Sequence, residues 1–397
     1  DGIDHEETWA VTTGLFRGAD DELLDAALEI WRHEEKAIPW AGAAFCKKPT
    51  ATTQRGGLAC FLPLPETDGP VWLHGWFDLH SSRKGITRTR DVGKTTEARY
   101  DWNRALMEHA VGPAWAMLIK QIQGSAAAQT KPYDLWPKPE HTRDELDQAL
   151  LTGFYRTAAE LPVIRGRDAN GYRWCGLNDE GVYSLPPVWH NRLLDPLLAE
   201  GWTLIDPLLS SWAKSGFEKV RVRPTLLMPA ALREAFHMDQ DIACTLEKAP
   251  RPALRQHDWV CVLGEFCAEG EWNRLYRLPF AFLADGLLHT FTKCGAVYCT
   301  NQDQRALLGP IPHRLLNVEN YQSKFSFPNI NTVEVYELTL GTLIDCIKEI
   351  LEKAQNKPNP QWLSAVFNDW ANLKKSTNIV TLCKSYRLFP PPITRVN

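Results

Sequence analysis

Residues 71–122 contain two hydrophobic patterns of different period, and this pair restricts the fold more than any other feature of the sequence. In residues 71–80 (VWLHGWFDLH), the odd positions other than Gly75 are apolar, as in a β-strand with one buried face. From about 101 to 122, apolar residues recur every three or four positions, as on one face of an α-helix. A chain in which such patterns alternate is predicted to form layers of helices and sheet.

The preceding residues continue this alternation. Apolar runs predict strands over 9–15, 38–46 and 57–65, and an amphipathic pattern predicts a helix over 20–34. The first 120 residues are therefore predicted to form a β-α-β-β-β-loop-α unit.

The whole chain is predicted to be a multidomain α/β (α+β) protein with four segments. They are an α/β domain (1–123), a Gly-, Ala- and Pro-rich linker (124–142), a mixed α/β domain (143–315) and a mainly helical segment (316–397). Thr142 is predicted to cap the helix that follows the linker, with Glu145 completing a capping box.

Composition excludes several classes of protein. The 397 residues include 44 basic and 48 acidic side chains, which gives a formal net charge of −4. The overall charge therefore does not indicate nucleic acid as a partner. No stretch of about 18 apolar residues indicates a membrane span. The ten cysteines form no C-x-x-C pair, so we expect no metal site and interpret them as reduced core residues of a cytoplasmic protein.

The basic stretch between Arg83 and Arg99 is the most informative candidate site. It follows a predicted strand, and cations at a strand exit can stabilise charge on a phosphoryl group. The alternative is a charged, solvated loop, and nucleic-acid binding is disfavoured because the stretch contains no interleaved aromatic residues.

Two other motifs have weaker chemical meaning. Gly93-Lys94-Thr95 resembles the end of a phosphate-binding P-loop, but Arg88 occupies the position of the first glycine. Asp78 and His80 share one face of the predicted strand, yet His74 lies roughly 13 Å from Asp78 along an extended strand, which disfavours a three-ligand metal site.

The order of several short motifs resembles the repeat unit of the sacsin family. The most specific similarity is CFLPLP (60–65), followed by an aromatic-rich strand and the turn SSRK (81–84). Other similar strings are WAV (9–11), IPWAGAA (38–44), LHGWF (73–77), WN (102–103) and PAW (113–115). The similarity is clear over about 9–120, diffuse over about 130–315, and not evident from 316 onward.

This resemblance implies the middle domain of a GHKL-type ATPase, the class that includes gyrase, MutL and the ninety-kilodalton heat-shock chaperones. In that class a Lys or Arg of the middle domain reaches the γ-phosphate, and Arg83 and Lys84 match its position. The ATP-binding motifs of the class are a helical Asn, a D-x-G-x-G sequence and a Gly-rich lid, and the sequence contains none of them. Because the sequence also starts at Asp1 without Met, we expect these motifs upstream.

The resemblance therefore predicts the middle region of an ATP-dependent molecular chaperone that couples ATP state to the binding of client or partner proteins. ATP and Mg are expected for the intact protein, whereas residues 1–397 alone are expected to bind no cofactor and to be inactive. The alternative is a non-catalytic protein-interaction scaffold in which the ATPase unit is only structural. A MutL-like role in DNA processing is a third possibility, which the acidic composition does not favour.

Overall fold

The computed structural model places most of the chain in two compact units. It describes residues 7–17, 21–32, 36–47, 56–66, 69–88, 94–124, 131–207, 209–291, 297–299, 307–316, 335–337, 340–354, 360–368, 373, 375 and 377–386. Unit 1 comprises residues 1–190 and 201–226, and unit 2 comprises residues 191–200 and 227–397. Both units contain helices and sheets, so the predicted mixed α/β (α+β) class is confirmed.

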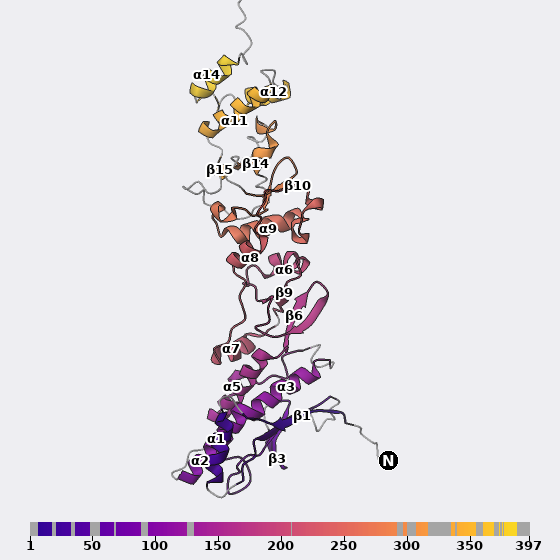
Figure 1. Cartoon of the computed structure of the whole chain (residues 1–397), viewed down its shortest axis with the longest axis vertical. Coiled ribbons are helices and arrows are strands. Elements are labelled where there is room, and N and C mark those ends of the chain that lie inside the picture. The colour runs from indigo at the N-terminus through magenta and orange to yellow at the C-terminus, as the bar shows by residue number, and fades with distance from the viewer. Residues whose placement is uncertain are drawn as a thin grey trace, which may run out of the picture. The chain divides into compact units, whose positions relative to one another are not determined.

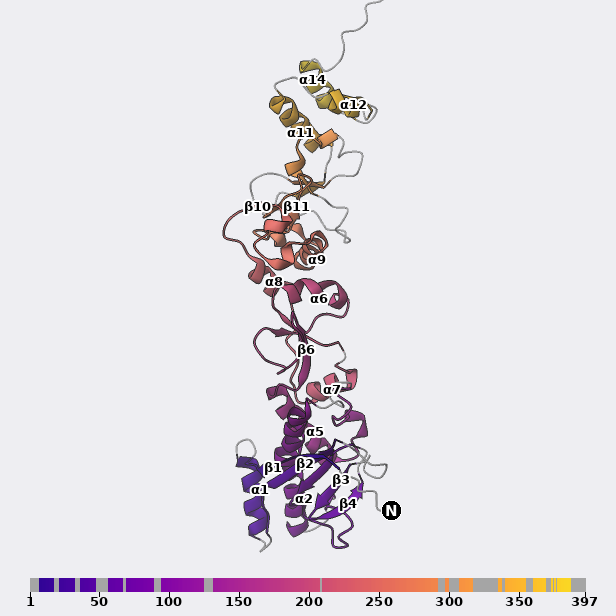
Figure 2. The ribbon, with the colours of Figure 1, turned by 90° about the vertical axis from the view of Figure 1, so that its right-hand side faces the viewer.

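A five-stranded sheet organises the first part of unit 1 (Figure 2). Its order is β1 (Trp9–Leu15), β2 (Trp40–Cys46), β5 (Trp72–Gly75), β3 (Gly57–Cys60) and β4 (Leu62–Glu66). All neighbours are antiparallel except β3 and β5. The strand predicted over 57–65 is divided at Phe61, whose φ of 62° lets Cys60 pair with Leu62 across a tight hairpin.

Helices cover one face of this sheet. They are α1 (Glu22–Trp31), α2 (Lys94–Leu106), the π-helical turn η2 (Met107–Val111), α3 (Gly112–Ile122) and α5 (Glu145–Glu160). Figure 1 shows α3 and α5 next to each other. The face of the sheet that packs against the helices carries small or aliphatic side chains such as Ala43, Leu58 and Leu73, which are all buried.

The boundaries of the compact units differ from the predicted segments, because part of the predicted linker lies in the core of unit 1. Tyr133 and Trp136 are buried there and pack against α5, which therefore belongs with residues 1–123 and not with a separate domain. The Gly, Ala and Pro content of 124–142 indicated a linker but did not account for these two aromatic anchors. Residues 125–130 lie outside the described residues.

The cap of α5 is also different from the prediction. Asp144 is the N-cap residue, and its Oδ1 accepts hydrogen bonds from the backbone N–H groups of Leu146 and Asp147. The hydroxyl of Thr142 instead donates to the carbonyl of Pro139. The predicted Thr142–Glu145 capping box is therefore wrong.

The rest of unit 1 is a second sheet with the helix α7 (Ser211–Lys219). This sheet has the order β7 (Gly171–Cys175), β6 (Ile164–Asp168), β9 (Thr203–Ile205) and β8 (Val182–Tyr183). Within it, β6 is antiparallel to both β7 and β9, and β8 is parallel to β9.

Unit 2 combines helices with two three-stranded sheets. Its principal helices are α6 (His190–Ala199, in this unit from residue 191), α8 (Pro229–Phe236), α9 (His257–Ala268), α11 (Leu340–Lys353), α12 (Pro360–Asn368) and α14 (Thr377–Ser385). The sheets are β10 (Ala243–Cys244), β12 (Leu288–His289) and β11 (Ala281–Phe282), and β14 (Leu315–Leu316), β13 (Val297–Cys299) and β15 (Val335–Glu337). The described residues from 316 onward are mostly helical.

The helices of the described residues do not include one that is both long and apolar enough to span a lipid bilayer.

Candidate functional site

The candidate site is a tight turn after β5 that carries Arg83 and Lys84, here called the cationic turn (residues 79–86). Its two ends are joined by an antiparallel bridge between Leu79 and Ile86. The N–H of His80 donates to the carbonyl of Gly85 at 2.9 Å, and the N–H of Arg83 donates to the carbonyl of His80 at 2.7 Å. These contacts define one backbone conformation for the turn.

Arg83 has a φ of 55°, which lies in the left-handed region that side chains other than glycine seldom adopt. Such a conformation costs on the order of 1–3 kcal/mol and persists only where neighbouring contacts enforce it. The cationic turn therefore contains a backbone that is held in place by its surroundings.

Arg83 and Lys84 both project from this turn into solvent. Both side chains are exposed, and neither forms an ion pair with another residue of the described parts of the chain. The strand predicted over 71–80 is observed as β5 and ends at Gly75, so Arg83 and Lys84 do not follow it directly but lie on the hydrogen-bonded turn.

Asn103 on α2 ties the two ends of the cationic turn to the core. It is completely buried, and its Nδ2 donates to the carbonyls of Asp78 (2.8 Å) and Thr87 (3.1 Å). Its Oδ1 accepts from the N–H of Asp78 at 2.8 Å. One amide side chain thus satisfies three backbone groups that would otherwise be buried without partners.

Arg88 extends this connection to α5. Its guanidinium contacts the carboxylates of Asp144 at 2.5 Å and Asp147 at 3.3 Å. Burial opposes the ionisation of Asp147, but the hydrogen bonds and positive charges of Arg143 and Arg88 outweigh burial and lower its pKa. Charge-assisted hydrogen bonds therefore join Arg88, which follows the cationic turn, to the N-terminal end of α5.

The other cations of the basic stretch are placed differently. Arg99 lies 3.7 Å from the carboxylate of Asp78. Lys94 is the first described residue of α2, whereas Arg90 and Gly93 lie outside the described residues, so the P-loop-like motif is only partly placed.

The side chains of the weak metal motif are used for other contacts. His74 Nε2 accepts a hydrogen bond from the N–H of Phe61, Asp78 accepts one from Thr87, and His80 Nδ1 contacts the hydroxyl of Ser82. The described part of the chain contains no group of three or more His, Cys, Asp or Glu residues arranged to hold a metal ion.

Sequence analysis did not identify the role of Asn103. The available signal was a polar residue three positions before Leu106 and seven before Ala110, on a helix face that is otherwise apolar. A buried amide at such a position requires hydrogen-bond partners, and the cationic turn supplies them.

Asn103→Ala is expected to destabilise unit 1 by about 2–3 kcal/mol, because it removes three hydrogen bonds and leaves buried backbone groups unpaired. Urea unfolding gives the stability, and hydrogen–deuterium exchange of peptides covering 78–88 is expected to accelerate. Glu97→Ala, on the exposed face of the same helix, serves as the control and should change neither. Equal exchange in both variants would refute the anchoring role of Asn103.

A scan against protein-family models and searches of curated proteins and of solved structures found no match to this chain.

Proposed function

We propose that unit 1 is the middle α/β domain of a sacsin-like, GHKL-type ATP-dependent chaperone and that its cationic turn senses the γ-phosphate of ATP. The observation that carries this proposal is the presentation of Arg83 and Lys84, which are exposed, adjacent and without an ion-pair partner among the described residues. The order of sequence motifs from Trp9 to Trp115 supplies the family assignment in this proposal.

The chemistry of the two side chains suits a phosphate oxyanion. Arginine offers a planar fork of N–H donors, and lysine adds a compact positive charge. Donors that are already oriented stabilise developing charge without reorganisation, and the hydrogen-bonded turn provides this orientation for the backbone.

The contacts of the turn also suggest how phosphate binding would be transmitted. Asn103 joins the turn to α2, and Arg88 joins it to α5. In this proposal, ATP and Mg bind to a separate GHKL domain of the same protein, and contact with the γ-phosphate displaces the turn together with these two helices. Client or partner proteins would respond to that displacement.

The proposal is tested in the full polypeptide that carries the nucleotide-binding domain. Arg83→Ala combined with Lys84→Ala is expected to lower ATP turnover at least about tenfold, with a much smaller change in ATP affinity. Steady-state hydrolysis and calorimetric ATP binding measure the two effects. Arg17→Ala combined with Lys120→Ala removes one exposed arginine and one exposed lysine elsewhere in unit 1 and should leave turnover unchanged.

Two results would contradict this proposal. Turnover of the Arg83/Lys84 variant equal to that of the control would remove the sensing role. Micromolar ATP binding by residues 1–397 alone would contradict the assignment of the ATP site to a separate domain.

A non-catalytic interaction scaffold is the second candidate, and a different observation favours it. The face of the five-stranded sheet opposite the helices exposes the apolar side chains of Trp9, Val11 and Leu15. A full-length protein without ATP turnover would support this scaffold function.

A cytoplasmic location is part of either proposal. Seven cysteines have described side chains and all are free thiols, five of them buried, which agrees with a reducing compartment.

A further inference from the structure

The two edges of the five-stranded sheet in unit 1 differ in their protection against pairing with another strand. The edge strands are β1 and β4. β4 contains Pro63 and Pro65, which have no N–H group to donate, and it ends at the charged residue Glu66. Prolines and charges on an edge strand oppose edge-to-edge association. β1 has the sequence WAVTTGL and contains neither, so of these two edges only β1 lacks such protection.

The odd-numbered residues of β1 direct their backbone groups away from the sheet. The carbonyl of Thr8 accepts a hydrogen bond from the N–H of Lys47 at 2.7 Å. The N–H of Phe16 donates to the carbonyl of Pro39 at 2.8 Å, so the even-numbered residues of this strand bond on the β2 side. Because backbone groups alternate in direction along a strand, those of residues 9, 11, 13 and 15 point outward. Among the described strands, only β2 pairs with β1.

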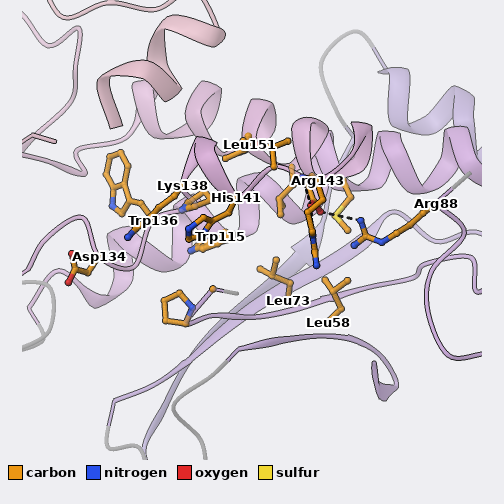
Figure 3. Close-up of a pocket in the computed structure, with 17 residues that line it drawn as sticks. Leu58, Leu73, Arg88, Trp115, Asp134, Trp136, Lys138, His141, Arg143 and Leu151 are labelled. Atoms are coloured by element: carbon orange, nitrogen blue, oxygen red, sulfur yellow. Dashed lines mark hydrogen bonds and ion pairs between the residues drawn. The ribbon is translucent and has the colours of Figure 1, made fainter. Parts of the chain in front are cut away.

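The side chains of these odd-numbered residues lie on the uncovered face of the sheet. Figure 3 shows Leu73 projecting from the sheet toward the helices, which identifies the covered face. In β1, Ala10 is buried on the covered face. The uncovered face carries Trp9, Val11 and Leu15, with exposed fractions of 36 %, 53 % and 72 %. An edge strand with exposed apolar side chains and no charged residue is typical of a surface that pairs with another chain.

The order of residues in β1 is complementary to a second, antiparallel copy of the strand. In a pair centred on Thr12, residues equally far from Thr12 lie opposite each other. Trp9 then lies opposite Leu15 of the second copy, and Val11 lies opposite Thr13 in the same way. These residues are odd-numbered, so each pair would exchange two hydrogen bonds between outward-pointing backbone groups. The apolar side chains would also contact each other across the strands.

The charged residues that flank β1 select this register. Glu7 and Arg17 are equally far from Thr12, so Glu7 of each copy would lie opposite Arg17 of the other. The Glu7 carboxylate accepts a hydrogen bond from Nε1 of Trp9 at 3.2 Å, which places both side chains on the same face. Arg17 is exposed and forms no ion pair with another residue of the described ranges. Opposite charges would therefore meet at both ends of the strand pair, and a shifted register would separate them.

We propose that unit 1 forms a homodimer in which two β1 strands pair in antiparallel orientation with Thr12 at the two-fold axis. The two five-stranded sheets would become one continuous sheet. A second copy is the occupant that the residues specify, because the strand and its flanking charges are complementary to themselves, as an interface between identical subunits requires. The inference is independent of the cationic turn and of ATP turnover.

The test is sedimentation velocity of residues 1–397 at increasing concentration. One pair of strands forms a small interface, so we expect dimers at about 10–100 μM protein. Val11→Pro removes an outward N–H that β2 does not use, and it should raise the concentration required for dimerisation at least about tenfold. Hydrogen–deuterium exchange of peptides covering 9–15 should slow as the unaltered protein dimerises, because pairing protects the outward N–H groups.

An exchange of charges tests the register without the use of proline. Arg17→Glu places like charges opposite each other at both ends of the strand pair and should weaken dimerisation about fivefold or more. Adding Glu7→Arg to this variant restores opposite charges and should recover the dimer. Lys120→Glu makes the same change of charge at an exposed lysine of α3 and should dimerise as the unaltered protein does.

Three results would overturn the proposal. A protein that stays monomeric at about 200 μM would exclude the homodimer and leave the β1 edge to an extended segment of a different protein. Dimerisation that Val11→Pro leaves unchanged would show that the contact lies elsewhere. If Glu7→Arg does not recover the dimer that Arg17→Glu weakens, the register centred on Thr12 is wrong.

Discussion

Gly153→Ala is expected to destabilise unit 1 by about 3 kcal/mol or more, because no space exists for a single methyl group at this position. A Cβ atom at residue 153 would lie 2.0 Å from the carbonyl oxygen and 2.8 Å from the carbonyl carbon of Glu108. Both atoms belong to the backbone of η2, so rotation of a side chain cannot relieve the clash. The helices would have to move apart.

Gly112, the first residue of α3 directly after η2, shows the same lack of space on the other side of this contact. A Cβ atom there would lie 2.6 Å from the backbone nitrogen of Phe154 and 2.7 Å from the carbonyl oxygen of Leu150. The two helices therefore meet backbone to backbone at a pair of glycines. Separating them would open the core next to this crossing, where the rings of Trp115 and Phe154 pack with centroids 5.6 Å apart.

Urea unfolding monitored by tryptophan fluorescence measures this loss of stability. The signal reports mainly on unit 1, because 12 of the 16 tryptophans belong to it. Gly124→Ala, at the end of α3, is the control, since a Cβ atom there meets nothing within 4 Å. Unfolding midpoints that agree between the two variants would show that α5 and η2 are not in backbone contact.

The sequence was most informative where burial follows a regular period. The strand predicted over 9–15 coincides with β1, in which Ala10 is buried between the exposed side chains of Trp9 and Val11. The helix predicted over about 101–122 belongs to a longer helical stretch from Lys94 to Ile122 that includes η2. The hydrophobic period does not reveal this π-helical turn.

Features that depend on contacts between distant residues could not be predicted in the same way. Gly153 must be glycine because Glu108 approaches it, and 45 positions separate the two residues in the sequence. Likewise, Trp136 in the predicted linker is buried by rings from α5 and α7. The composition of a segment does not indicate which distant residues will contact it in the fold.

The candidate site shows the same distinction. Arg83 and Lys84 were selected because a basic pair directly follows the strand predicted over 71–80, although β5 ends at Gly75. The rigidity of their turn could not be recognised, since it depends on Asn103 and on the contacts of Arg88 with Asp144 and Asp147. The predicted contact with the γ-phosphate stays a prediction. The structure adds only that the backbone of the turn is held by hydrogen bonds.

Asp206→Ala is expected to destabilise unit 1 by about 3 kcal/mol, because it removes the carboxylate that pairs with a largely buried arginine. The carboxylate of Asp206 is 2 % exposed and lies 2.7 Å from Nε of Arg165, whose side chain is 13 % exposed. The backbone N–H of Asp206 also donates to the carbonyl of Arg165, next to the antiparallel pairing of β6 with β9. Removing the carboxylate leaves the guanidinium largely shielded from water and without this counterion.

A second variant distinguishes the effect of the Arg165 charge, which has lost the Asp206 carboxylate, from the loss of packing. Combining Asp206→Ala with Arg165→Met removes both charges, and this double variant is expected to be more stable than Asp206→Ala alone. The control is Glu218→Ala, because Glu218 and Arg223 form an exposed pair 3.9 Å apart that contributes at most about 1 kcal/mol. Urea unfolding of the four proteins completes the comparison. If the double variant is less stable than Asp206→Ala, the cost does not come from an uncompensated charge on Arg165.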